Sequence, residues 1–188
     1  MAGYREIETW NYLERKVSLM KMTELFLGEL EREAAVTRRA LERVPEGRYD
    51  WKPHPKSMAL GTLAQLCASM PSWIPMIIDQ DELDIAPTNG KKYEQTKLST
   101  RKELVDAHDK NVAGAREALS KTTDEHLTTL WRMLVGGRVV DENQRHIVLR
   151  DSVFNHLAHH RGQLTVYLRL NDASVPEIYG PSADEGKF

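Results

Sequence analysis

The apolar positions of the chain fall into four long helical patterns that are separated by breaks. In residues 4–44 the apolar side chains stand at helical spacing among Glu and Arg residues, and the pattern ends at the Pro and Gly of residues 44–47. The apolar residues that carry this pattern are Leu27, Leu30, Ala34 and Leu41. Thr23 has the side chain of an N-cap, so we expect residues 1–19 to be an N-terminal extension that forms an extra helix.

The second helical pattern begins after Ser57 and runs towards Ile78. Pro71 and Pro75 interrupt this pattern and predict a kink. The segment that follows, residues 80–98, is polar and contains Pro, Asn and Gly, so we expect a long crossover there.

Two more helices complete the pattern, at about residues 100–121 and 147–171. The first of them opens with the Thr-x-x-Glu of a capping box. Between them, the Gly pair at 136–137 is flanked by apolar residues and predicts a small hairpin or an irregular loop. We therefore expect an all-α fold in one domain at residues 20–188, a four-helix bundle with an extended C-terminal tail.

Composition narrows the classes of function. The chain has 188 residues, 26 basic and 28 acidic side chains and no strongly basic block, so nucleic-acid binding is not expected. No apolar run approaches the roughly 18 residues of a membrane span, and the first residues lack the apolar stretch of a signal peptide. Cys67 is the single cysteine, which excludes an intrachain disulfide and a Cys-rich zinc site and favours a reducing cytoplasm.

The densest chemical signal lies in the last helix, which contains three of the seven histidines. Residues four apart on an α-helix are separated by about 40° around its axis, so His156 and His160 project in the same direction. The apolar residues on the same face are Leu149, Val153, Leu164 and Tyr167. The sequence therefore predicts that this histidine pair lies in the middle of a buried stripe.

Two interpretations of this pair follow from its chemistry. Two imidazoles one turn apart can hold Zn²⁺, Ni²⁺ or a similar divalent ion, although a catalytic metal site needs at least one more protein ligand. Alternatively, both rings are core histidines that bond to Gln163, Ser152, a backbone carbonyl or water, since an unsatisfied buried imidazole costs about 1–3 kcal/mol. His159, on the edge of the same face, is a substitute for His160.

Other catalytic motifs do not occur in the sequence. No histidine has a glutamate three residues before it, as a ferritin-like di-iron site requires, and there is no Gly-x-Ser-x-Gly elbow or phosphate-binding glycine loop. A di-iron protein, a serine hydrolase and an NTPase are thus unsupported. We expect the remaining histidines to be surface or boundary residues, namely His54, His108, His126 and His146.

Taken together, several motifs resemble those of the DinB-like (YfiT-type) proteins. The C-terminal motifs are His-Leu-Ala-His-His-Arg-Gly-Gln-Leu at 156–164, Tyr-Leu-Arg at 167–169 and the tail at 175–185. The N-terminal ones are Glu-Leu-Phe-Leu at 24–27, Arg-Arg-Ala-Leu at 38–41, Val-Pro-Glu at 44–46, Trp-Lys-Pro-His at 51–54 and Ser-Met-Ala-Leu-Gly at 57–61. The resemblance covers about residues 20–185.

This resemblance implies an up-down-down-up bundle that is frequently a homodimer. Members commonly bind a divalent metal through one histidine of the second helix and a His-x-x-x-His pair of the fourth, and they include thiol-dependent transferases and isomerases. The pair carries over to His156 and His160. The third ligand does not, because Leu66 stands where similar family members have histidine, and leucine cannot coordinate a cation. Cys67 and His54 are weaker substitutes for that ligand.

The expected function combines these points. The resemblance implies a metal-dependent hydrolase or a thiol-dependent transferase whose metal site is degraded at Leu66. The alternative is a non-catalytic bundle that binds a small molecule, a thiol or a protein partner in a stress response. Trp73, His159, Gln163 and Tyr167 are the candidates for lining a pocket beside the histidine pair, and plain core packing is the simpler explanation for Trp73 and Tyr167.

Overall fold

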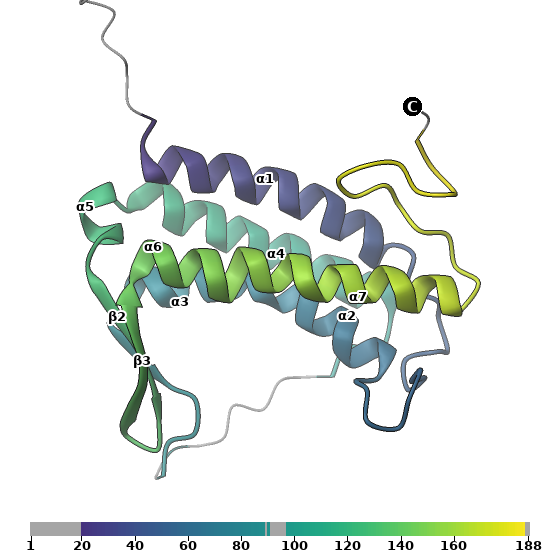
Figure 1. The fold of residues 1–188 in the computed structure, drawn as a ribbon, viewed down its shortest axis with the longest axis horizontal. Coiled ribbons are helices and arrows are strands. Elements are labelled where there is room, and N and C mark those ends of the chain that lie inside the picture. The colour runs from purple at the N-terminus through teal and green to yellow at the C-terminus, as the bar shows by residue number, and fades with distance from the viewer. Residues whose placement is uncertain (1–19, 89, 91–96, 187–188) are drawn as a thin grey trace, which may run out of the picture.

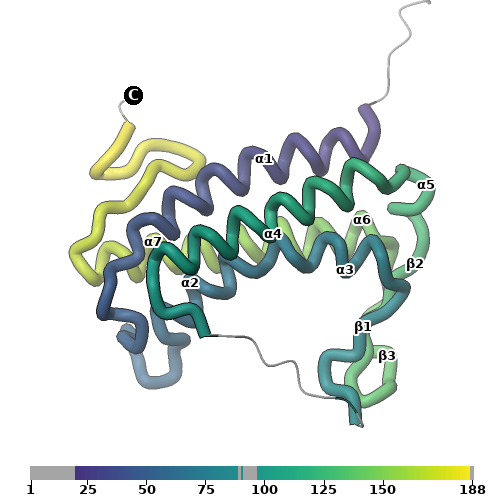
Figure 2. The backbone as a smooth tube through the Cα atoms, turned by 180° about the vertical axis from the view of Figure 1, so that it is seen from behind, coloured from purple at the N-terminus to yellow at the C-terminus, as the bar shows by residue number. Residues whose placement is uncertain are grey.

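The computed structural model describes residues 20–88, 90 and 97–186, and the predicted N-terminal extension lies outside this part of the chain. Its body is a bundle of four helical arms (Figure 1). The arms are α1 (Met22–Leu41), α2 with α3 (Leu60–Ser69 and Trp73–Asp79), α4 (Arg101–Lys121), and α6 with α7 (Arg145–Val148 and His156–Leu170). The first and last arms run in one direction and the two middle arms run in the other (Figure 2).

The second arm is broken where the prolines predict a kink. A short 3₁₀ turn, η1 (Met70–Ser72), contains Pro71 and joins α2 to α3. Proline has no N–H to donate and clashes with the preceding turn, so an unbroken α-helix cannot pass through it at low energy. The consequence for the site is that Trp73 begins a new helix opposite the last arm.

The local sequence predicts the N-terminus of α4 correctly but not that of α1. The predicted capping box of α4 is present, with the backbone N–H of Glu103 donating to Oγ1 of Thr100 at 3.2 Å. The predicted cap at Thr23 is wrong, because α1 begins at Met22. Its first N–H groups donate instead to the carboxylate of Asp124, at 2.9 Å from Met22 and 3.1 Å from Thr23. Asp124 belongs to the short helix α5 (Asp124–Leu127).

A three-stranded sheet corrects the all-α prediction. Its strands are β1 (Glu82–Asp84), β2 (Leu130–Val135) and β3 (Arg138–Gln144), in the order β1-β2-β3. β2 and β3 form an antiparallel hairpin around Gly136 and Gly137, whose φ angles of 59° and 79° favour glycine. β1 pairs in parallel with β2 and lies in the segment predicted as a crossover. The three residues of β1, two of them acidic, are too few to show periodicity, so only the distant partner strand makes them a strand.

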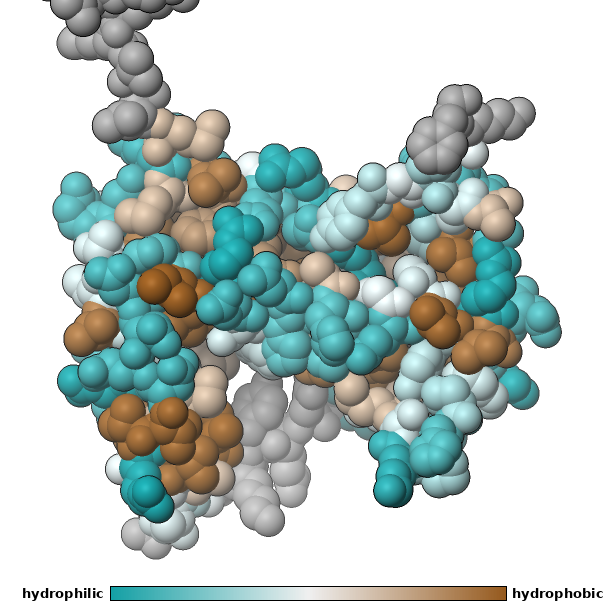
Figure 3. Space-filling view, viewed as in Figure 1, coloured by the Kyte–Doolittle hydropathy of each residue, from teal (hydrophilic) through white to brown (hydrophobic). Residues whose placement is uncertain are grey.

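The sheet projects from one end of the bundle. Asp84 of β1 holds the hairpin turn, since its carboxylate accepts from the backbone N–H of Gly136 at 3.0 Å and of Gly137 at 2.7 Å. Apolar surface gathers over this sheet at the lower left of Figure 3, where Val139 and Val140 of β3 are each more than half exposed. None of the described helices is long and apolar enough to cross a membrane.

The bundle interior contains two apolar clusters with buried polar groups between them. On α1, Glu33 and Thr37 are buried between Leu30 of one cluster and Leu41 of the other. On α4, His108 occupies the equivalent position between two apolar layers and is only 1% exposed. The middle of the bundle therefore carries charge and hydrogen-bonding groups away from water.

Candidate functional site

A π-helical segment positions the histidines of the last arm. The sequence predicts one continuous helix over residues 147–171, whereas the structure has α6, then η2 (Leu149–Asn155) with π-helical hydrogen bonds, then α7. A π segment adds one residue to a turn and rotates everything after it, and such segments are frequent at functional sites. His156 is the first residue of α7, directly after this rotation.

The two imidazoles of His156 and His160 face each other. Their Nε2 atoms are 2.9 Å apart, and their ring centroids are 4.6 Å apart. His160 is 8% exposed and His156 is half-buried, so the pair lies at the edge of the core. The spacing of four residues on α7 thus brings two nitrogen lone-pair positions to one point.

The second ring nitrogen of His160 is already engaged. Its Nδ1 lies 2.8 Å from the side-chain oxygen of Gln163, and the His156 ring interacts with the backbone at Ser152. When Nδ1 carries the proton, Nε2 presents a lone pair. If Nδ1 carries the proton in both rings, the two Nε2 lone pairs face each other, an arrangement that a cation between them stabilises. If one Nε2 carries the proton instead, the rings are hydrogen-bonded to each other.

Protonation of His156 is disfavoured, so a proton does not readily serve as that cation. The pKa of His156 is held below its ordinary value, first because burial removes water from the ring and second because His160 lies beside it. The hydrogen bond at Ser152 opposes this shift. The neutral form of the ring is the form that binds metal ions, so the environment favours a ligand over an imidazolium.

Three of the four predicted pocket residues gather around this pair. The side-chain amide of Gln163 also contacts Nε2 of His159 at 3.0 Å, and His159 itself is exposed. Trp73 lies across the pair, with its ring centroid 5.8 Å from that of His156. Tyr167 packs elsewhere, edge-on against Trp51.

The position at which the family resemblance implies a third ligand is apolar. Leu66 of α2 is partly buried against the core cluster that contains Leu157 and Leu164, which flank His160 along α7. Within residues 20–88, 90 and 97–186, no group of three or more His, Cys, Asp and Glu side chains is arranged to hold a metal ion. The protein thus offers two convergent imidazoles and no third protein ligand in the described residues.

Neither suggested substitute supplies that ligand. Cys67 is fully buried, and burial raises the pKa of its thiol to about 12, so the thiolate that binds metals is strongly disfavoured. His54 is exposed in a loop, where its Nδ1 lies 3.2 Å from the backbone nitrogen of Lys56. Of the candidate ligands, only His156 and His160 therefore lie side by side.

One expected boundary histidine is in fact a core residue. His108 is 1% exposed and its Nε2 has no hydrogen-bond partner among the described residues. Burial lowers the pKa of His108, so the folded protein favours the neutral ring. The surface prediction for His108 is wrong because it lies on the inner face of α4, a face on which every neighbouring turn is apolar.

Sequence reasoning missed a buried charge network next to the histidines. Arg161 is 1% exposed and forms an ion pair with Glu33 at 2.6 Å and a hydrogen bond with Thr37 at 2.9 Å. Tyr179 of the C-terminal tail donates to the same Glu33 carboxylate at 2.8 Å and covers the guanidinium. The signal available in the sequence was an arginine on the otherwise apolar inner face of the last helix.

A second missed arginine supports the sheet. Arg145 is 1% exposed, and its guanidinium bonds to the backbone oxygens of Ile77 at 3.0 Å and Leu130 at 2.7 Å and to the carboxylate of Asp81 at 2.5 Å. These groups come from the end of α3, the start of β2 and the approach to β1. Arg145 is therefore structural, and it ties the sheet to the bundle.

The fold and the inner histidine pair are those of a four-helix bundle with candidate ligands on its last helix. Similarity to known proteins identifies the family. The profile of the DinB family matches residues 19–187, so the chain belongs to the DinB family. A solved DinB-like protein from Bacillus cereus ATCC 10987 is 25% identical, with 82% of this chain and 95% of that chain covered and a TM-score of 0.61.

A second solved structure shares the fold. The DinB-like protein YjoA from Bacillus subtilis is 17% identical, with 86% of this chain and 99% of that chain covered and a TM-score of 0.61. Among curated proteins, none matches the chain.

Proposed function

We propose that the protein binds a divalent metal ion through Nε2 of His156 and Nε2 of His160. The observation that carries this proposal is the 2.9 Å approach of the two Nε2 atoms while Nδ1 of His160 is held by Gln163. Two ligands of one tetrahedral zinc ion stand about 3.3 Å apart, so a small rotation of either ring would accommodate the ion.

Residues around the two histidines would hold the rings in the orientation that binds the metal ion. Gln163 would orient His160 and favour the tautomer with the proton on Nδ1, and the backbone at Ser152 would orient the His156 ring. Trp73 covers one side of His156 and limits the access of water there. A bound divalent ion would act as a Lewis acid at this site.

The reaction class follows from the open coordination positions. With two protein ligands in place of three, the remaining positions are available to water or to a thiol, which supports a hydrolase or a thiol S-transferase. Leu66 makes this site weaker than a three-histidine site would be. We further expect the protein to work as a homodimer in the cytoplasm.

A second candidate function is a non-catalytic bundle that binds a small molecule or a protein partner. The lack of any three-residue ligand group among residues 20–88, 90 and 97–186 favours it, as does the apolar side chain of Leu66. In this case the histidine pair would be a satisfied structural contact.

Metal titration of the protein without a histidine tag separates the two candidates. We expect one Zn²⁺ or Ni²⁺ per chain, lost in His156→Ala and retained in His54→Ala, the exposed control. Leu66→His should tighten binding by completing a three-histidine set. Equal binding by wild type and His156→Ala would overturn the metal proposal, and absence of binding in wild type, His156→Ala and His54→Ala would favour the non-catalytic bundle.

A further inference from the structure

An apolar groove lies between the first turn of α1 and the junction of α6 with η2. Its volume is about 230 Å³, which is below the roughly 300–1,000 Å³ of small-molecule pockets. The lining residues are Met22, Leu25, Phe26, His146, Ile147 and Arg150. The groove therefore suits a side chain of a polypeptide better than a free ligand.

The apolar rim of this groove is open to solvent. Leu25 is 41% exposed and Ile147 is 38% exposed, whereas Phe26 beside them is buried. Arg150 adds a cation to the same surface, with its guanidinium carbon 5.5 Å from the centroid of the Phe26 ring and its Nη1 paired with Glu29. An apolar surface next to a cation is a surface that an amphipathic helix with an acidic side can cover.

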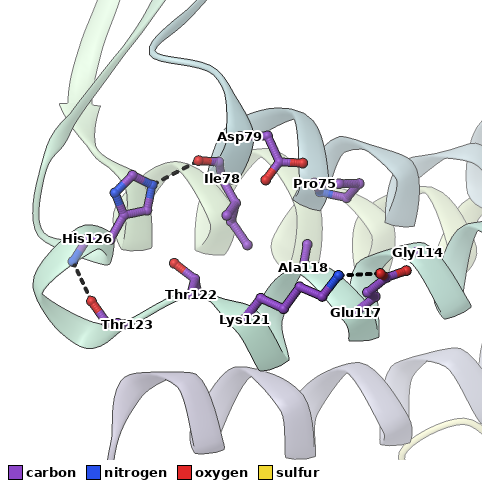
Figure 4. A pocket seen from close by; sticks show the side chains of 10 residues that line it. All are labelled: Pro75, Ile78, Asp79, Gly114, Glu117, Ala118, Lys121, Thr122, Thr123 and His126. Atoms are coloured by element: carbon purple, nitrogen blue, oxygen red, sulfur yellow. Dashed lines mark hydrogen bonds and ion pairs between the residues drawn. The ribbon is translucent and has the colours of Figure 1, made fainter.

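The chain turns where it enters α1, at the edge of the groove. Lys21 is extended, and the carboxylate of Asp124 binds the first N–H groups of α1 where the carbonyls of a preceding helical turn would otherwise lie. The α5 helix that carries Asp124 is held in turn, because Nε2 of His126 lies 2.8 Å from the carbonyl oxygen of Ile78 (Figure 4). The chain before Met20 is therefore not a continuation of α1, and its attachment point adjoins the groove.

The sequence of residues 1–19 has an apolar side of the kind that such a groove accepts. Ile7, Trp10, Leu13 and Val17 recur at spacings of three, three and four residues, which places them on one side of a helix. A tryptophan buries a large apolar area, so Trp10 is the natural anchor of this side.

The charges of this segment also fit the groove. On the same helix, Glu6 and Glu14 fall within about 50° of the centre of the apolar side, whereas all three basic residues of the segment fall on the opposite side. The acidic flank thus matches the cation at Arg150. The family profile begins at residue 19, so this segment lies outside the family match.

We propose that residues 4–18 form an amphipathic helix that docks on this groove of the same chain, with Trp10 in the groove and the acidic flank towards Arg150. Because the segment is tethered beside its site, its effective concentration is in the millimolar range and a weak intrinsic affinity is sufficient. The docked helix also covers the beginning of η2, the segment that precedes His156.

Hydrogen exchange of the full chain, followed by mass spectrometry, tests the docking. An isolated helix of this length is marginal in water, so slow exchange in residues 7–17 reports contact with the bundle. We expect Leu25→Asp and Ile147→Asp each to speed this exchange by about tenfold or more while α4 stays protected. Val139→Asp, at an exposed valine of β3, is the control and should change nothing. Rapid exchange of residues 7–17 in wild type, or unchanged protection in both groove variants, would overturn the proposal.

Crosslinking identifies the chain that supplies the helix. Glu14→Cys combined with Ile147→Cys would be treated with a short bismaleimide in a mixture of ¹⁵N-labelled and unlabelled protein, and the buried Cys67 should not react. We expect linked peptides in which both halves carry the same label, and no link when Val139→Cys replaces Ile147→Cys. Links between differently labelled chains at the statistical frequency, or no link in the Ile147→Cys protein, would overturn docking within one chain.

Discussion

The side-chain oxygen of Gln163 lies 2.8 Å from Nδ1 of His160, the ring nitrogen opposite the one that faces His156. Under the proposed metal binding, this contact makes Gln163 the residue that favours the His160 tautomer whose Nε2 is free to bind the ion. Partners of this kind, when removed, typically cost 10–100-fold in metal affinity.

Gln163→Leu should therefore weaken Zn²⁺ binding by about 10–100-fold, and Gln163→Glu, which keeps an acceptor, should not. Competition against a chelating dye measures both. Thr165→Ala is the control on the same helix, because that hydroxyl bonds only to the carbonyl of Gly162. Wild-type Zn²⁺ affinity in Gln163→Leu would show that Gln163 does not position His160 for binding.

His108 predicts a pH dependence of stability. Burial lowers its pKa in the folded state, so the unfolded state binds the proton more readily. The corresponding stability is fully present above the unfolded value near 6.5 and is lost as pH falls through the folded pKa. Urea unfolding between pH 7.5 and 5 should show this decline, and His108→Leu should flatten it. An equally steep decline in the variant would contradict the prediction, while His54→Ala serves as the exposed control.

The buried ion pair of Arg161 and Glu33 should be costly to break from one side. Glu33→Leu leaves the guanidinium unpaired in the interior and should lower the free energy of unfolding by about 3–5 kcal/mol. The double variant Glu33→Leu with Arg161→Leu should regain part of this loss, because no charge remains buried. Chemical denaturation measures both proteins. A double variant that is less stable than Glu33→Leu would contradict this prediction.

The start of α1 depends on a residue a hundred positions away. Asp124→Ala removes the acceptor for the N–H groups of Met22 and Thr23 and should lower the melting temperature. Asp124→Asn keeps one acceptor oxygen and should lower it less. Asp106→Ala, an exposed aspartate that caps no helix, is the control in the same thermal scan. Equal melting temperatures for Asp124→Ala and the control would show that this cap contributes nothing.

Periodicity predicted the helices well because a 3.6-residue repeat is a local property of the sequence. The α4 helix and its cap follow from residues that are neighbours along the chain. β1 could not be predicted in the same way, since its three residues become a strand only by pairing with β2, about 50 positions later. The all-α class was wrong for this reason.

In the candidate site, too, some features follow from the local sequence and others from contacts between distant segments. The convergence of His156 and His160 follows from their spacing on one helix. The π segment before His156, the burial of His108 and the contact between Arg161 and Glu33 each depend on how different helices pack, which no single stretch of sequence encodes. That Leu66 replaces the third ligand is predicted by the family resemblance alone, because no local pattern marks that position.

The most direct test of the central claim is X-ray absorption spectroscopy of the zinc-titrated protein. A site built on His156 and His160 predicts a first shell with two imidazole nitrogens at about 2.0–2.1 Å, completed by oxygen from water or by sulfur from a thiol. The double variant His156→Ala with His160→Ala should lose the imidazole signal. The same two-imidazole spectrum in the double variant would contradict the account.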